Sequence, residues 1–100
     1  MVASALMRIA IIGSGGVGGY YGGRLAAAGS DVIFFARGAH LDALRSRGLR
    51  IHSPLGDLHL PHVHATDDPA PVGPADVVFF TVKLYDTEAA VRMLPPLVGL

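Results

Sequence analysis

Residues 8–37 read RIAIIGSGGVGGYYGGRLAAAGSDVIFFAR, and the fold class of the chain follows from their pattern. It contains an apolar run over residues 8–12, a turn with the spacing G-x-G-x-x-G over residues 13–18, a helical run, and a second apolar run. A strand, a glycine turn, a helix and a second strand within about 30 residues form the dinucleotide-binding unit of doubly wound α/β folds. The flanking elements make the motif specific, because the glycine spacing alone arises by chance in a chain with 13 glycines.

The glycine turn predicts a binding site for a pyrophosphate. Backbone N–H groups at a helix N-terminus bind anions, and a Cβ atom would block their approach. We expect Gly13 to allow the sharp turn, Gly15 to let the backbone approach the phosphates, and Gly18 to let the helix pack on the strand. Ser14 is interpreted as a phosphate contact. The alternative, a glycine-rich surface turn without a ligand, does not explain why the glycines follow an apolar strand.

The end of the second strand predicts which nucleotide is bound. NAD sites usually carry Asp or Glu there, whereas NADP sites carry a neutral residue with an Arg nearby. The strand is expected over residues 32–36, and Arg37 follows it with a guanidinium group that suits a phosphate. Asp31 stands at the start of this strand and is therefore discounted. The sequence favours NADP(H), and the alternative is that Arg37 caps the loop and faces water.

The rest of the chain extends this unit into a Rossmann-type, doubly wound α/β fold with a mostly parallel sheet. The elements expected after the glycine turn are helices over residues 16–28, 39–47 and 84–94, a β-hairpin over residues 49–60, and strands over residues 63–65 and 75–82. A Pro-rich loop is expected over residues 66–74, and Pro95-Pro96 are expected to end the last helix. Gly22 is expected on the same helix face as Gly18, against the sheet.

The apolar strand over residues 75–82 leads to a further candidate residue. Its β-branched and aromatic side chains predict burial on both faces of the strand. Ligands bind beyond the carboxyl ends of parallel strands, so Lys83 is expected at the same edge as Gly13 and Arg37.

The composition excludes several classes of function. Eight basic and eight acidic residues give a formal net charge of zero, so no basic surplus drives nucleic-acid binding. No lysine-rich block and no apolar run of about 18 residues points to a membrane. The chain has no cysteine, which excludes a disulfide scaffold and fits a reducing compartment. We expect a cytoplasmic protein with a leader over residues 1–6 and one domain over residues 7–100.

A histidine cluster, formed by His59, His62 and His64, is the other constellation that chemistry could use. Together with Asp67 or Asp68 these side chains could bind a metal ion. The segment is a Pro-broken hairpin without a visible supporting pattern, so solvated histidines are the favoured interpretation and no metal site is expected. The sequence also predicts no catalytic residue within these 100 positions.

The sequence resembles the N-terminal domain of the ketopantoate reductases (2-dehydropantoate 2-reductases) from about residue 7 to residue 100. The segments that carry the resemblance are Ile11-Ile12-Gly13-Ser14-Gly15-Gly16-Val17-Gly18, Phe35-Ala36-Arg37-Gly38, Gly48-Leu49-Arg50-Ile51 with its hairpin, and Thr81-Val82-Lys83. The resemblance implies an NADPH-dependent oxidoreductase that reduces ketopantoate to pantoate in pantothenate biosynthesis. It implies that Gly13, Ser14, Gly15, Gly16, Val17 and Gly18 hold the pyrophosphate. By the same resemblance, Arg37 holds the 2′-phosphate and Lys83 lies near the ribose or nicotinamide.

The chain also departs from that family. Family members continue with a further strand and a helical domain that supplies a catalytic Lys and the substrate-binding residues. The 100-residue chain is therefore expected to be truncated, to bind cofactor with little or no turnover, and to self-associate through an exposed sheet edge. The alternatives are a non-catalytic nucleotide-binding module and a reductase for another 2-keto acid or an imine. A methyltransferase-type site would want an acidic residue where Arg37 stands.

Overall fold

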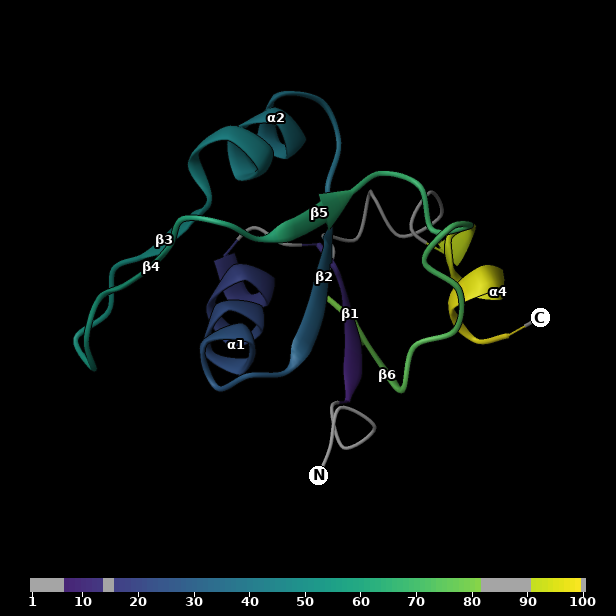
Figure 1. The fold of residues 1–100 in the computed structure, drawn as a ribbon, viewed down its shortest axis with the longest axis horizontal. Helices are drawn as coiled ribbons and strands as arrows, with labels where there is room; N and C mark the ends of the chain where they lie inside the picture. The colour runs from purple at the N-terminus through teal and green to yellow at the C-terminus, as the bar shows by residue number, and fades with distance from the viewer. Residues whose placement is uncertain (1–6, 14–15, 82–90, 100) are drawn as a thin grey trace.

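The computed structural model describes residues 7–13, 16–81 and 91–99. Its helices and strands are β1 (Arg8–Ile12), α1 (Gly16–Ala27), β2 (Asp31–Phe35), α2 (Gly38–Arg47), β3 (Leu49–Ile51), β4 (Leu58–Leu60), β5 (His64–Thr66), β6 (Val77–Phe80) and α4 (Leu94–Leu97). Four strands form a parallel sheet in the order β5-β2-β1-β6, and β3 and β4 form an antiparallel hairpin. This is the predicted Rossmann-like α/β fold with an inserted hairpin (Figure 1).

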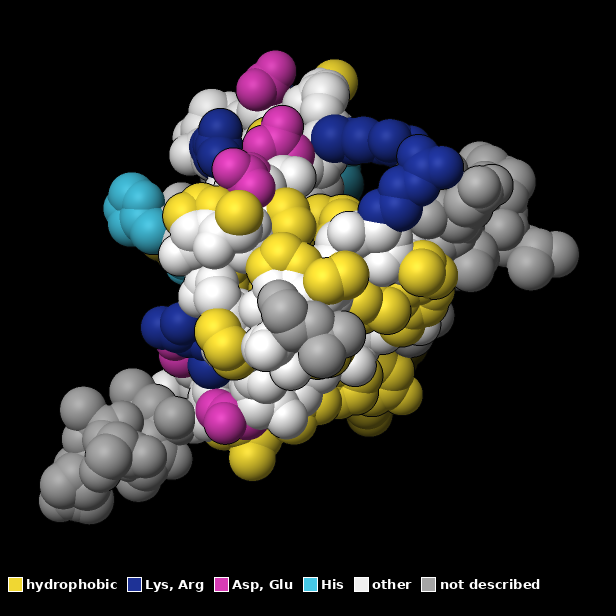
Figure 2. Space-filling model, turned by 90° about the vertical axis from the view of Figure 1, so that its right-hand side faces the viewer, with side chains coloured by type: hydrophobic (Ala, Val, Ile, Leu, Met, Phe, Trp, Pro, Cys, Tyr) yellow, Lys and Arg dark blue, Asp and Glu magenta, His cyan; other side chains and the backbone are white. Residues whose placement is uncertain are grey.

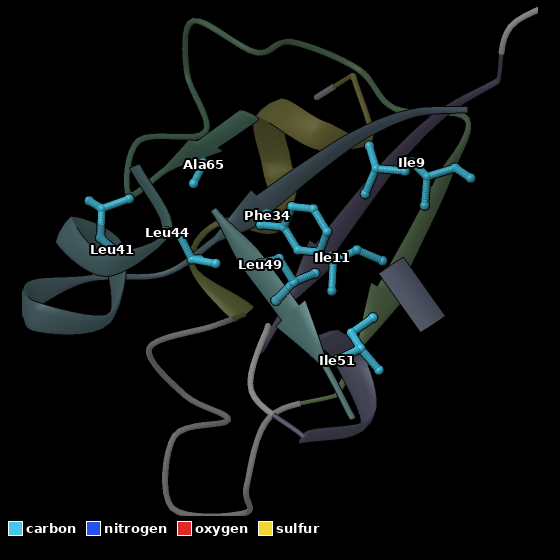
Figure 3. Packing of buried hydrophobic residues seen from close by; sticks show 9 residues of the cluster. Ile9, Ile11, Phe34, Leu41, Leu44, Leu49, Ile51 and Ala65 are labelled. Carbon is cyan, nitrogen blue, oxygen red and sulfur yellow. The ribbon is translucent and has the colours of Figure 1, made fainter. Parts of the chain in front are cut away.

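Two apolar clusters lie on opposite faces of the parallel sheet, because side chains alternate along each strand. The first cluster joins β1 and β2 to α2 and the hairpin, and Figure 3 shows Phe34 among its members. Its buried residues are Ile9, Ile11, Val32, Phe34, Leu41, Leu44, Leu49, Ile51 and Ala65. The second cluster joins Ala10, Ile12, Ile33 and Phe35 to Leu97 of α4. Figure 1 accordingly shows α1 and α4 on opposite sides of the sheet.

Close packing of α1 explains part of its unusual glycine content. A Cβ atom at Gly22 would lie 2.6 Å from Cε1 of Phe34 and 3.0 Å from Cγ1 of Ile11, which confirms that this helix face lies against the sheet. A Cβ atom at Gly23 would meet the side chains of Ile51 and Leu49 in the hairpin. Glycine at positions 22 and 23 therefore lets α1 lie closer to the parallel sheet and to the hairpin than a larger residue at these positions would allow.

The burial predicted for the strand over residues 75–82 is wrong. The strand covers Val77–Phe80, and Phe79 and Phe80 are 37% and 38% exposed. Among the described strands β6 lies at one end of the sheet and pairs with β1 alone, whereas β1 and β2 each have a neighbour on both sides. The apolar sequence of β6, which is typical of a strand buried inside a sheet, therefore lies at the end of the described sheet.

Several boundaries differ by a residue or two from those expected. Strand β2 ends at Phe35, one residue earlier than expected, although the N–H of Ala36 still donates to the carbonyl of Thr66 in β5 at 3.1 Å. Thr66, expected in the loop, is the last residue of β5. Helix α2 begins at Gly38, one residue earlier than expected, and ends at Arg47, followed by Gly48 as its C-cap with a φ of 75°.

The expected role of the paired prolines at the end of the chain is also wrong. Pro95 and Pro96 lie inside α4 at its first positions, where the missing N–H groups have no partner to lose. The preceding helix, expected over residues 84–94, lies largely outside the described residues, as does the leader expected over residues 1–6. Within the described ranges, every helix is too short or too polar to cross a lipid bilayer.

Candidate dinucleotide-binding site

Three strand ends lie side by side at one edge of the parallel sheet. In the pairing register Ile12 of β1 faces Phe35 of β2 on one side and Phe80 of β6 on the other. The residues that follow these ends, Gly13 and Thr81 among them, therefore lie at the carboxyl edge. The chain runs outward from β1 through β2 to β5 and then returns to place β6 on the other side of β1. Doubly wound sheets bind their ligands at this switch in strand order.

The glycine turn leaves β1 in a conformation that requires glycine. Gly13 has a φ of 93°, in the left-handed region that side chains disfavour. The first turn of α1 begins at Gly16, so its backbone N–H groups start directly beyond the loop. The geometric prediction of a sharp turn at Gly13 is confirmed, and its role in binding a nucleotide stays a prediction.

Gly18 brings α1 into contact with the turn that precedes it. A Cβ atom at Gly18 would overlap the carbonyl oxygen of Gly13 and would lie 2.5 Å from Oγ1 of Thr81. Backbone atoms cannot move aside as a flexible side chain can, so only glycine fits here. The predicted close packing of helix on strand at Gly18 is thus confirmed.

Thr81 also lies at this edge, and the sequence pattern alone does not mark it as part of the site. Its N–H donates to the carbonyl of Ile12 at 2.8 Å, and its hydroxyl lies 2.6 Å from the carbonyl oxygen of Gly13. The available signal was a threonine directly after an apolar strand, at the edge where ligands bind. That signal does not show which backbone group the hydroxyl would reach.

Arg37 follows β2 at the same edge and precedes α2. Its backbone is extended, with φ −146° and ψ 164°, in the N-cap position of α2, and its side chain is exposed. The residues after β2 carry no carboxylate, since Ala36 and Arg37 come first. Asp31 lies at the opposite end of β2, where Arg8 Nε donates to its Oδ2 at 3.1 Å. The structure therefore agrees with discounting Asp31 as a ribose ligand.

The remaining predicted residues divide into two groups. Gly16 and Val17 begin α1, as expected for residues that lead from the loop into the helix. Ser14, Gly15 and Lys83 lie outside the described residues. The parts of the predicted site that the structure brings into contact are therefore Gly13 and Gly18, joined by Thr81.

The histidine cluster lies away from this edge. His62 and His64 line an open hollow of about 240 Å³ beside Asp31, at the amino end of β2. All three histidines of the cluster are exposed, and the described residues contain no group of three His, Asp or Glu side chains placed to hold a metal ion.

Asp57 is a charged group with a perturbed pKa, at the tip of the hairpin. The N–H of Ser53 donates to Asp57 at 3.1 Å and is the main reason that the pKa of this carboxyl is lowered. Desolvation opposes this shift in part, and His52, 3.6 Å away, adds to the lowering. The hairpin tip is held beside the last turn of α1, where Arg24 donates to the carbonyl of Gly56. This charge therefore lies near the opposite end of α1 from the glycine turn.

Comparisons with known proteins bear on the whole chain. The family model described as ketopantoate reductase PanE/ApbA matches residues 9–100. The 2-dehydropantoate 2-reductases of Nostoc sp. and Archaeoglobus fulgidus are 38% and 43% identical to this chain over 91 and 89 residues. A crystal structure of 2-dehydropantoate 2-reductase from Geobacter metallireducens has 38% identity and a TM-score of 0.85, and the match covers 93% of this chain.

The matches cover much less of the relatives. The chain spans 28% of the length of the two curated reductases and 31% of the Geobacter chain. What is shared is the segment that contains the glycine turn, Arg37 and Thr81.

Proposed function

Because this chain belongs to the ketopantoate reductase family, PanE/ApbA, we propose that it is the NADP(H)-binding part of a reductase that converts 2-dehydropantoate to pantoate. The observation that carries the proposal is the contact of Gly13 with Gly18 at the switch in strand order. The absence of cysteine fits a reducing compartment, and the proposal places the protein in the cytoplasm.

The proposed site binds the two ends of the dinucleotide with different chemistry. Backbone N–H groups at the start of α1 hold the pyrophosphate, as helix N-termini do for anions. The residues assigned to this role are Gly13, Ser14, Gly15, Gly16, Val17 and Gly18. The Arg37 guanidinium holds the 2′-phosphate, because it is a cation with a forked set of donors that matches the phosphate oxygens. Lys83 is assigned to the ribose or nicotinamide.

The chain's part in the reaction is to bind and orient the cofactor. When bound, the nicotinamide supplies the hydride that reduces the ketone carbon, and a proton completes the alcohol. The chain spans 28% of the curated relatives, so we propose that alone it binds NADPH with little or no turnover of 2-dehydropantoate. Ready reduction of 2-dehydropantoate by the purified chain would contradict this second statement.

Side-by-side titration of the chain with NADPH and NADH tests the proposal. We expect tighter binding of NADPH, and we expect Arg37→Ala to lose about tenfold or more in NADPH affinity while NADH affinity changes little, because a hydrogen bond to a charged group is removed. Arg47→Ala is the matched control, since Arg47 is exposed at the other end of the same helix.

The possible results of these titrations lead to different conclusions. Equal binding of NADPH and NADH by the unaltered chain contradicts the assignment of the 2′-phosphate to Arg37. Binding of neither nucleotide by a chain that melts cooperatively contradicts the dinucleotide site itself. A loss in Arg47→Ala as large as that in Arg37→Ala would show a general effect of charge.

We also propose that the chain self-associates through the β6 side of the sheet. Phe79 and Phe80 are more than a third exposed there, and among the described strands β6 pairs with β1 alone, an arrangement that favours association. Figure 2 shows further apolar side chains over the face that carries α4, where Val98 is 53% exposed. Light scattering should give a molar mass above that of one chain. The Phe79→Lys variant should give a lower molar mass than the unaltered chain. A monodisperse monomer at high concentration contradicts this proposal.

A further inference from the structure

Thr81 lies where the sheet changes its strand order. It follows β6 directly, and its N–H continues the β1–β6 ladder by donating to the carbonyl of Ile12 at 2.8 Å. Figure 1 shows β6 alongside β1, the strand that leads into the glycine turn. The side chain of Thr81 therefore projects from the element next to the turn and not from the turn itself.

The hydroxyl of Thr81 has two carbonyl oxygens within reach. Oγ1 lies 2.6 Å from the oxygen of Gly13 and 3.1 Å from the oxygen of Ile12. A hydroxyl has one proton to donate, and the carbonyl of Ile12 already accepts the N–H of Thr81. The shorter contact, to Gly13, is therefore the bond that the hydroxyl proton makes.

Close packing leaves the Gly13 carbonyl little freedom. A Cβ atom at Gly18 would overlap this oxygen and lie 2.5 Å from Oγ1 of Thr81, so the three groups are packed together. A peptide group is planar, so holding the carbonyl of Gly13 restrains rotation of the peptide plane to which that carbonyl belongs. Gly13 itself supplies no restraint, because glycine populates positive and negative φ with similar ease.

We propose that Thr81 is a positioning residue for the dinucleotide loop, and that its hydroxyl sets the orientation of the Gly13 peptide from which the loop over residues 13–18 begins. Thr81 acts through Gly13 and is not itself assigned a contact with the cofactor. The inference rests on the proposed function, since the loop is the pyrophosphate site. It predicts that nucleotide affinity depends on a hydroxyl at position 81 and not on the methyl group.

Two substitutions at position 81 separate these groups. Thr81→Val keeps the shape and removes the hydroxyl, whereas Thr81→Ser keeps the hydroxyl and removes the methyl group. We expect Thr81→Val to weaken NADPH and NADH binding by the same factor, about tenfold, because a partly buried carbonyl loses its donor. We expect Thr81→Ser to stay within about twofold of the unaltered chain, since it keeps that donor. If Thr81 acted only through packing of its methyl group, Thr81→Ser would weaken nucleotide binding more than Thr81→Val.

Thr66→Val is the matched control. Thr66 ends β5, and its hydroxyl accepts the N–H of Asp68 at 3.1 Å, in a local turn beyond a different strand. We expect this variant to lose one hydrogen bond without loss of nucleotide affinity. All titrations are made well below the melting temperature of each variant, so that differences in global stability do not enter the measured affinity.

The outcomes distinguish this inference from the proposed function. Equal affinity of the unaltered chain and Thr81→Val overturns the inference and leaves the dinucleotide site standing. Binding of neither nucleotide by the unaltered chain overturns both. If Thr81→Val does not fold, Thr81→Ala is compared with Thr81→Ser, because these two differ by the hydroxyl alone. Failure of both hydroxyl-free variants to fold, with Thr81→Ser intact, assigns the hydroxyl to the fold and overturns the inference.

Discussion

The two ends of the parallel strands are closed in different ways. At the amino ends, Arg8 donates through Nε to Asp31 at 3.1 Å and through Nη1 to the carbonyl of Val72 at 2.9 Å, while its N–H donates to Asp76 at 2.7 Å. At the carboxyl ends, the described contacts are made by backbone groups and by two hydroxyls. The hydroxyl of Thr81 donates to the carbonyl of Gly13, and that of Thr66 accepts the N–H of Asp68.

This contrast between the two ends indicates where the sheet can bind a ligand. At the amino ends, Arg8 of β1 pairs with Asp31 of β2, and the Asp76 carboxylate accepts the backbone N–H of Arg8, so charged side chains connect the strands. At the carboxyl ends, Gly13 and Gly18 remove side-chain bulk from the turn, so backbone groups can approach a ligand. Substitutions at the amino ends should therefore change stability alone, whereas those at the carboxyl ends should change binding as well.

Gly18→Ala should have the largest effect, because it places bulk at the carboxyl ends. The new Cβ atom would overlap the carbonyl of Gly13, so we expect a loss of about 3 kcal/mol in the free energy of unfolding and the loss of measurable NADPH binding. Urea denaturation and an NADPH titration measure the two effects.

The control for Gly18→Ala is the same substitution in the same helix at Gly23. There the Cβ atom meets the flexible end of Ile51 in the hairpin, so we expect about 1 kcal/mol of destabilisation with NADPH binding kept. Equal binding by Gly18→Ala and the unaltered chain would falsify the assigned difference between the two ends.

Arg8→Met should have a smaller effect, confined to stability. The substitution keeps an apolar stem and removes the contacts of Arg8 to Asp31 and Val72. Water partly screens these contacts, because the Arg8 side chain is 45% exposed. We expect a loss of about 1 kcal/mol in the free energy of unfolding, measured by urea denaturation. NADPH affinity should not change, and a parallel loss of affinity would show that the amino ends also shape the site.

Asp57→Asn should have the smallest effect, away from both ends of the sheet. The N–H of Ser53 and then His52 lower the pKa of Asp57 below its ordinary value of 3.8. The ionised form is therefore the stabilising one above pH 3.8, and this contribution is lost as the pH falls through the folded-state pKa. The melting temperatures of the unaltered chain and Asp57→Asn should differ above pH 3.8. They should converge below the folded-state pKa of Asp57. A difference independent of pH would contradict this origin.

The first three elements could be predicted because their determinants are local. Apolar runs, the glycine spacing and the stop at Gly29, where φ is 102°, all lie within residues 8–37. The hairpin could be predicted for the same reason, from alternation on either side of a turn. In each case, neighbours in the sequence are also neighbours in the structure.

The features that were missed depend on neighbours distant in the sequence. The exposure of Phe79 follows from the place of β6 at the end of the sheet, which a strand's own composition does not encode. The bond from Thr81 to Gly13 depends on the register between β1 and β6. Paired prolines occur both after the end of a helix and in the first turn of a helix. The local sequence around Pro95 and Pro96 therefore does not distinguish these two positions.

The bond between Thr81 and Gly13 also has a consequence for the order of folding. Its two residues are 68 positions apart, so the glycine turn leaves the ribosome long before the threonine that contacts it. Contacts of such long sequence separation carry a high loop-closure entropy and form slowly. We therefore expect β1, β2 and β5 to associate first and β6 to dock afterwards, so that the proposed nucleotide site is completed only after these three strands have paired.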